Sequence, residues 1–179
     1  MAGQRLTDKT ALADNLASDD LLMCVDVSDT TGSAEGTSLK IQNKFVIQTD
    51  KVSISSAEFQ AMDSTGGAGT FKQLLLESGV GFGYVILGVT TVNTYVSVTD
   101  TSAANLRIGY APSSSLFWVD VRRYMNGVSA NATFTFGPQA ASLGMGTTLD
   151  NNKVNVWASG NFNGDFTADF YITYQVVKL

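Results

Sequence analysis

The sequence predicts an all-β protein, with a short N-terminal β module followed by an antiparallel, jelly-roll-like β-sandwich. Three observations predict this class. Short segments rich in β-branched and aromatic residues recur from residue 71 onward, Gly, Asn, Ser and Asp separate them, and no amphipathic helix of useful length lies among them. We place the boundary after residue 50, so that residues 1–50 form a β-hairpin anchor module and residues 51–179 form the sandwich body.

The anchor module is predicted from two strand-like segments and a turn. Leu21–Val27 is an apolar run of strand length, Thr30–Gly36 has the small and glycine-containing composition of a turn, and Thr37–Ile47 is the expected return strand. The preceding residues 1–16 fit a short helix or an extended arm equally well. Apolar residues of the two strands are candidates for anchor or interface contacts: Leu21, Leu22, Val25, Val27 and Ile41.

The body is expected to open with a short helix. Ser55 and Glu58 have the spacing of a capping box, in which the hydroxyl and the carboxylate each accept a backbone N–H. One or two helical turns through Met62 should follow. The glycine-rich residues 64–69 lack the Gly-Lys-Ser/Thr ending of a phosphate-binding loop, so we interpret them as a helix terminator.

Seven strands are predicted after the helix, over residues 71–76, 84–98, 106–110, 116–123, 132–136, 153–158 and 166–178. Alternation in residues 133–136 and 154–157 indicates one buried and one outward face. The final strand reads as apolar on both faces, which favours a position covered on both sides, either central in a sheet or against another subunit.

The segment Asn161–Asp165 has two interpretations. Oxygen-bearing side chains at alternate positions are reminiscent of a calcium loop, but their order is unusual and no bidentate Glu follows at the proper distance. The favoured interpretation is a hairpin in which Asn163-Gly164 takes the two positive-φ positions of a type I′ turn.

Composition excludes most chemistry. The chain has no His, one Cys and 15% charged residues, which excludes the ordinary His-dependent triads, His-based zinc sites and a disulfide within the chain. Cys24 is expected to be a small buried hydrophobe. A glycosidase needs two carboxyl groups flanking a sugar, and the body offers only Glu58, Glu77 and scattered Asp residues. We expect no enzyme activity, no cofactor and no metal.

Charge and hydropathy also limit the partners. The formal net charge is −5 and there is no basic run, so we expect no nucleic acid partner. No apolar run reaches the ~20 residues that cross a bilayer, and the first residues lack the apolar core of a secretory signal, so no membrane partner is expected.

Aromatic residues offer a further kind of contact. Trp118, Tyr124 and Trp157 are candidates for subunit contacts, or for stacking on glycans if they gather on one exposed surface. Trp157 falls on the face opposite Val154 and Val156, which predicts that it faces outward and is covered by an interface.

The phrase from Asp19 to Ile41, with its core Asp26-Val-Ser-Asp29-Thr-Thr and Ala34-Glu-Gly-Thr-Ser38, resembles a module near the start of tailed-bacteriophage virion proteins. The matching stretch runs from about Leu6 to Ile47. Residues 52–65, residues 72–86 and the closing strand Tyr171–Leu179 are similar to β-rich virion proteins of podoviruses and crAss-like phages.

These resemblances imply a phage virion structural protein, assembled in the cytoplasm of the bacterial host. They imply a capsid-surface decoration or head-fibre component that docks on other virion proteins by its N-terminal module and forms a homo-oligomer, with a trimer preferred. The alternatives are a tail-fibre base or adaptor, or a module of the virion that binds a host surface glycan.

Overall fold

The computed structural model describes residues 46–64, 70–110, 117–137 and 150–179 and, for the backbone alone, residues 21–26 and 37–42. The chain divides into two compact units, Met1–Val46 and Ile47–Leu179. The first contains strands β1 (Leu21–Asp26) and β2 (Thr37–Gln42). They form an antiparallel pair with Leu21 opposite Gln42 and Asp26 opposite Thr37, in the order expected for the hairpin.

The second unit begins four residues before the predicted boundary. The return strand β2 ends at Gln42, and a separate strand, β3 (Ile47–Ile54), follows it. Strand β3 pairs over its whole length with the last strand of the chain, β10 (Phe166–Lys178). Residues 47–50 therefore belong to the body, because their backbone hydrogen bonds are made to the C-terminal strand and not to the hairpin.

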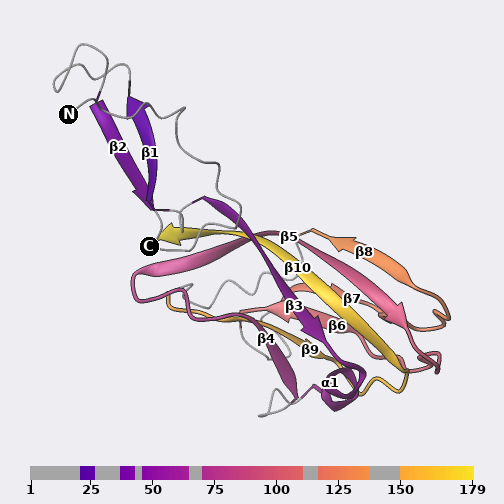
Figure 1. Cartoon of the computed structure of the whole chain (residues 1–179). Coiled ribbons are helices and arrows are strands. Elements are labelled where there is room, and N and C mark those ends of the chain that lie inside the picture. Colours follow the sequence, from indigo (N-terminus) through magenta and orange to yellow (C-terminus); the bar gives the residue numbers. More distant parts are fainter. Residues whose placement is uncertain (1–20, 27–36, 43–45, 65–69, 111–116, 138–149) are drawn as a thin grey trace. The chain divides into compact units, whose positions relative to one another are not determined.

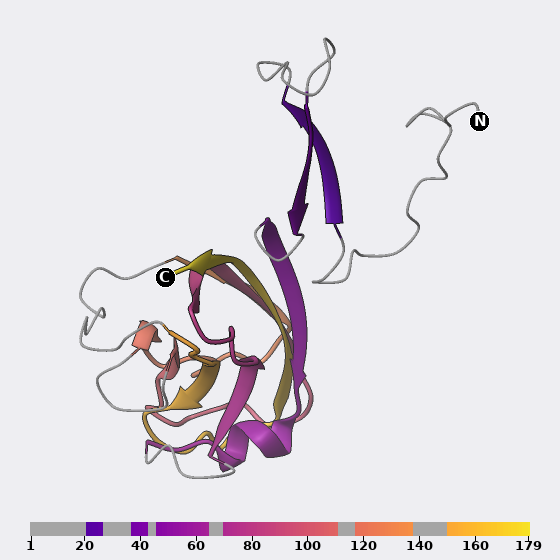
Figure 2. The ribbon, with the colours of Figure 1, turned by 90° about the vertical axis from the view of Figure 1, so that its left-hand side faces the viewer.

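The body is an antiparallel β-sandwich, as predicted (Figure 1, Figure 2). One four-stranded sheet has the order β3-β10-β5-β8 and the other the order β4-β9-β6-β7. The remaining strands are β4 (Phe71–Leu75), β5 (Phe82–Tyr95), β6 (Leu106–Gly109), β7 (Phe117–Val121), β8 (Ala132–Phe136) and β9 (Val154–Ala158). Their bounds lie within three residues of the predicted ones, because period-two alternation marks each strand.

Strand β10 is central in its sheet, between β3 and β5, which confirms one part of its prediction. Within the chain only one of its faces is buried, and the covering of the other face by another subunit stays a prediction. Six alternate residues from Phe166 to Val176 are buried, whereas the residues between them are half-buried. Four of those five intervening positions carry Thr, Asp or Gln, so the strand has one apolar and one mixed face.

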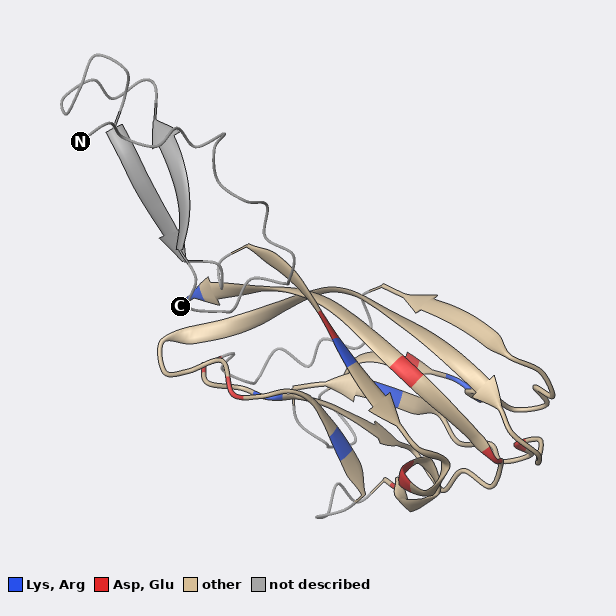
Figure 3. Cartoon of the chain, viewed as in Figure 1, with Lys and Arg blue, Asp and Glu red and all other residues tan. Residues whose placement is uncertain are grey.

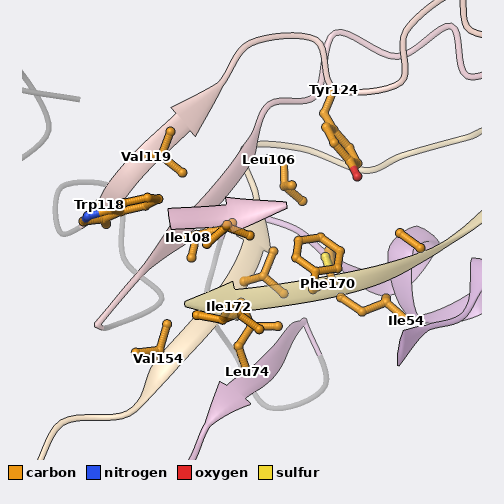
Figure 4. Packing of buried hydrophobic residues seen from close by; sticks show 14 of the residues in the cluster. Ile54, Leu74, Leu106, Ile108, Trp118, Val119, Tyr124, Val154, Phe170 and Ile172 are labelled. Carbon is orange, nitrogen blue, oxygen red and sulfur yellow. The ribbon is translucent and has the colours of Figure 1, made fainter. Parts of the chain in front are cut away.

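The core lies between the two sheets (Figure 4). Phe170 and Ile172 from β10 pack towards Leu106, Ile108 and Val154 of the opposite sheet. The predicted capping box begins helix α1 (Ser56–Ala61): Ser55 Oγ accepts the Glu58 N–H, and Glu58 accepts the Ser55 N–H. The short helix buries Phe59 at one end of the sandwich.

Phe59 joins the helix to both ends of the segment that leads into β10. Its ring centroid lies 4.6 Å from that of Phe166 and 5.8 Å from that of Phe162, the latter edge-on. The side chain has no solvent exposure. Aromatic pairs at such distances add to the stabilisation from burial alone.

We predict that Phe59→Ala lowers the free energy of unfolding by about 3–5 kcal/mol, because it leaves a cavity at a site enclosed by other rings. Denaturant unfolding followed by fluorescence measures the change. Val80→Ala is the control, since Val80 is 81% exposed. A loss below about 1 kcal/mol for Phe59→Ala would show that this end of the sandwich does not depend on the helix.

Candidate interaction surface

The face of the β3-β10-β5-β8 sheet that is turned away from the core, here called the outer face, presents residues from four neighbouring strands. Val85, Leu87 and Val92 of β5 are exposed on it, as is Ile47 of β3. Strands β5 and β8 contain no charged residue (Figure 3). An uncharged sheet face with exposed branched aliphatic residues is suited to contact with another protein surface.

Hydroxyl pairs link the strands across this face. Thr49 Oγ1 lies 3.0 Å from Thr173 Oγ1 between β3 and β10, and Thr90 Oγ1 lies 3.2 Å from Thr135 Oγ1 between β5 and β8. Each pair joins residues in direct register. Cross-strand Thr pairs stabilise a sheet and keep its surface compatible with water without adding charge.

The charges of the outer face neutralise each other. Lys51 Nζ lies 2.8 Å from Asp169 Oδ2, and Ser53 Oγ donates to Asp169 Oδ1 at 2.6 Å. The hydrogen bond with Lys51 holds the pKa of Asp169 below its ordinary value, and the same bond raises the pKa of Lys51. The carboxylate therefore stays ionised and paired at neutral pH.

Asp169 and Glu58 both line a shallow depression of about 310 Å³, together with Ser53 and Val92. The hydrogen bond from Lys72, 2.5 Å away, lowers the pKa of Glu58 to about 2. Glycoside hydrolysis needs one carboxyl group whose pKa is raised so that it can donate a proton. Both pKa values are shifted the opposite way, so neither group is suited to that role.

Glu77, the third carboxylate considered in the sequence, does not line this depression. Glu77 Oε1 lies 3.1 Å from Lys153 Nζ, in an exposed ion pair. Among the described residues, no group of three or more His, Cys, Asp and Glu side chains could hold a metal ion. The same residues include no helix long and apolar enough to cross a bilayer.

The segment Asn161–Asp165 is organised by a buried carboxylate that the sequence did not point to. Asp100 is 1% exposed. Its Oδ1 accepts the Ser102 N–H at 2.9 Å and the Ser102 hydroxyl at 2.7 Å. Its Oδ2 accepts the N–H groups of Asn163 at 2.9 Å and Gly164 at 3.0 Å. A buried carboxylate is stable only when its oxygens are satisfied in this way.

The predicted type I′ turn at Asn163-Gly164 is therefore wrong. Neither residue has a positive φ, and the flanking strands β9 and β10 lie in different sheets, so the segment crosses between sheets. Gly164 is required for another reason: a Cβ there would lie 2.6 Å from the Cβ of Asp100. Asn163 Oδ1 accepts the Thr101 N–H, and Asp165 Oδ2 accepts the Ser97 hydroxyl, so the oxygens of the supposed calcium loop serve protein contacts.

The three aromatic candidates do not gather on a solvent surface. Trp118 is 4% exposed, Tyr124 is 2% exposed and Trp157 is fully buried. The outward position predicted for Trp157 is wrong, because all five residues of β9 are buried and the strand lies inside its sheet with Phe71 and Arg107 in register on either side. The period-two pattern identified the two faces of β9 but could not show that both are covered.

Tyr124 closes a polar network inside the core. Its hydroxyl donates to Asn93 Oδ1 and approaches Thr91 Oγ1 at 3.1 Å, and Asn93 Nδ2 donates to the Ala132 carbonyl at 3.1 Å. Asn93 and Thr91 are buried on β5. Two polar residues on the inward face of a strand were the sequence signal for a buried partner, and they explain why Tyr124 points inward.

The anchor candidates lie on the hairpin. Leu21, Leu22 and Val25 belong to β1 and Ile41 to β2, with Leu22 directly opposite Ile41. Cys24 is opposite Leu39 on the same pair of strands. Val27 lies outside the described residues.

No known protein family and no curated protein matches the chain. Among solved structures, the capsid asymmetric unit of cyanophage Pam1 is 16% identical, with 97% of this chain and 98% of that chain covered and a TM-score of 0.38. The native virion of Kashmir bee virus at neutral pH is 11% identical, with 96% of each chain covered and a TM-score of 0.34. At TM-scores this low, we base no conclusion on either structure.

We predict that Asp100→Asn lowers the free energy of unfolding by about 1–3 kcal/mol, since an amide nitrogen cannot accept the N–H groups that one carboxylate oxygen now accepts. Denaturant unfolding measures the change. Asp165→Asn is the matched control: that residue is half-buried, and its carboxylate accepts hydrogen bonds from the hydroxyls of Ser97 and Ser56. Equal losses for the two variants would contradict the central role of Asp100.

We predict that Glu58 makes a small contribution to the stability of the fold and that this contribution is lost in acid. Its folded pKa of about 2 lies below the ordinary value of 4.5, so its stabilisation is present above pH 4.5 and is lost as the pH falls towards 2. Glu58→Gln should lower the melting temperature at pH 7, with a loss of at most about 1 kcal/mol because the pair is partly exposed.

The two melting temperatures should converge at pH 2. Lys72→Met should reduce the same pH dependence by removing the partner. A constant difference between Glu58→Gln and the original chain from pH 7 to pH 2 would contradict this assignment.

Proposed function

We propose that this chain is a non-enzymatic structural protein of a bacteriophage virion. It docks on the particle by its N-terminal hairpin and self-associates through its sandwich body. The observation that carries the proposal is that the phrase from Asp19 to Ile41, which resembles a phage virion module, falls within one compact unit of the chain. A docking element that is separate from the body can bind a partner without disturbing the sandwich.

The outer face supports the second half of the proposal. It exposes Val85, Leu87 and Val92 on a strand without charge, and its Lys51–Asp169 pair is already neutralised. Surfaces that become buried in assemblies are depleted in free charge in this way, because desolvating an unpaired charge is costly. The partners are therefore further copies of the chain and other virion proteins.

Within the virion we favour a capsid-surface decoration or a head-fibre component, assembled in the host cytoplasm. A tail-fibre base or adaptor would use the same two units and is the main alternative. The alternative of a glycan-binding module has little support, because Trp118, Tyr124 and Trp157 are buried and offer no surface on which a sugar could stack. The trimer implied by the resemblance remains a prediction.

We predict that a chain starting at Ile47 folds but does not enter particles, because it keeps every strand of the sandwich and lacks the hairpin. Particles would be purified from cells that supply either the full chain or residues 47–179, and the copies per particle would be measured by quantitative mass spectrometry. Incorporation should fall at least tenfold, on the order expected for losing one docking contact.

The control is a chain starting at Ser55, which also lacks β3. It should melt at a lower temperature than residues 47–179, since β3 pairs with β10 along eight residues. Normal incorporation of residues 47–179 would show that the hairpin is not the docking element.

A further inference from the structure

Within the described residues, the edge strands of the two sheets are β3, β8, β4 and β7. An edge strand presents unpaired backbone N–H and C=O groups, which can pair with a strand of another molecule. Monomeric proteins protect such edges from intermolecular pairing with charged side chains, proline residues or β-bulges. The four edges of this body differ sharply in these features.

Three of the edges carry charge. Strand β3 contains Asp50 and Lys51, β4 contains Lys72, and β7 contains Asp120. Pairing irregularities also interrupt the registers of β4 with β9 and of β6 with β7. Strand β8, Ala-Thr-Phe-Thr-Phe, has no charge and no proline, and its register with β5 is regular throughout (Figure 3).

Strand β8 is also poorly covered for a strand that bears two phenylalanines. None of its five residues is buried: Thr133 and Thr135 are exposed, and Phe134 and Phe136 are half-buried. The two rings stack at 6.2 Å with an interplanar angle of 19°, and Phe134 lies 5.6 Å from the ring of Tyr124 at the margin of the core. A strand added beside β8 would cover these rings and satisfy its backbone at the same time.

We propose that β8 pairs with β8 of a second copy of this chain, antiparallel about a twofold axis, so that the β3-β10-β5-β8 sheet continues from one copy into the next. This inference rests on the proposed self-association and gives it a specific contact. With Phe134 opposite its own counterpart, Thr133 faces Thr135 of the second copy. No cross-strand pair then places like charges opposite each other. An isologous contact of this kind forms a closed dimer.

A second copy is the favoured occupant because the strand is self-complementary in this register. A charged edge, such as β3 of another copy with Asp50 and Lys51, would place charged side chains beside an uncharged strand, where removing them from water is costly. The contact has twofold symmetry, in contrast to the threefold arrangement implied by the resemblance. The number of chains in solution therefore distinguishes the two arrangements.

The test uses two full-length variants with opposite charge, Thr133→Lys/Thr135→Lys and Thr133→Glu/Thr135→Glu, measured by sedimentation equilibrium. The original chain should show twice the mass of 19.0 kDa at high concentration. Each variant alone should sediment as a single chain, because like charges oppose each other across the axis. An equimolar mixture of the two should regain the two-chain mass, since each Lys then faces a Glu.

The matched control is Leu76→Lys/Val80→Lys, which adds two charges at exposed positions outside the β3-β10-β5-β8 sheet. This control should associate like the original chain. Near-ultraviolet circular dichroism checks that each variant keeps a packed core.

Three outcomes would overturn the contact. If both charged variants associate as the original chain does, self-association uses another surface and the proposed function stands. If both variants are monomeric and their equimolar mixture is monomeric as well, β8 pairs with a strand other than β8 of a second copy. If the original chain is single at every concentration, the proposed self-association fails with it.

Discussion

The body depends on the antiparallel pairing of the last strand, β10, with two strands from the first half of the sequence, β3 and β5. This places residues 47–54, 82–95 and 166–178 in one sheet, so the first and the last strand of the body are both needed to complete it. The same register fixes both faces. Because side chains alternate along a strand, the positions that bury Phe166, Phe170 and Ile172 also set which residues form the outer face, and a one-residue shift would exchange the two.

The carboxylates at the outer face and the buried carboxylate of Asp100 all have hydrogen-bonding or ionic partners. Each carboxylate near the surface described above has a nearby partner: Asp169 has Lys51, and Glu58 has Lys72. The buried carboxylate of Asp100 instead accepts backbone N–H groups and a hydroxyl. Free charge would make the outer face costly to cover, and a raised carboxyl pKa would be needed for acid catalysis. Local pairing lowers the pKa values of Asp169 and Glu58 and reduces the cost of covering the outer face, which supports the proposed contact with other proteins.

The sequence predicted the features that depend on neighbouring residues, such as strands and the helix cap. It did not predict the features that depend on contacts between distant residues. Period-two alternation located the strands from 71 to 178, and the spacing of Ser55 and Glu58 gave the helix cap. The Asn163-Gly164 pair was misassigned because a hairpin and a crossing between sheets use the same residues, and only Asp100, sixty-three residues away from Asn163, distinguishes them. Trp157 was misplaced because the alternation of one strand cannot show that other parts of the chain cover its second face.

The topology relates the proposed contact to the proposed docking unit. The sheet has two edges, β3 on one side and β8 on the other, with β10 and β5 between them. The chain enters the body at Ile47, the first residue of β3, so the connection from the hairpin joins the sheet at the edge opposite β8. Pairing through β8 would therefore leave the connected edge of each copy free. The proposed self-contact would use backbone groups of β8, whereas the proposed docking contact would use the hairpin, which belongs to a separate compact unit, so the two would not compete for the same backbone groups.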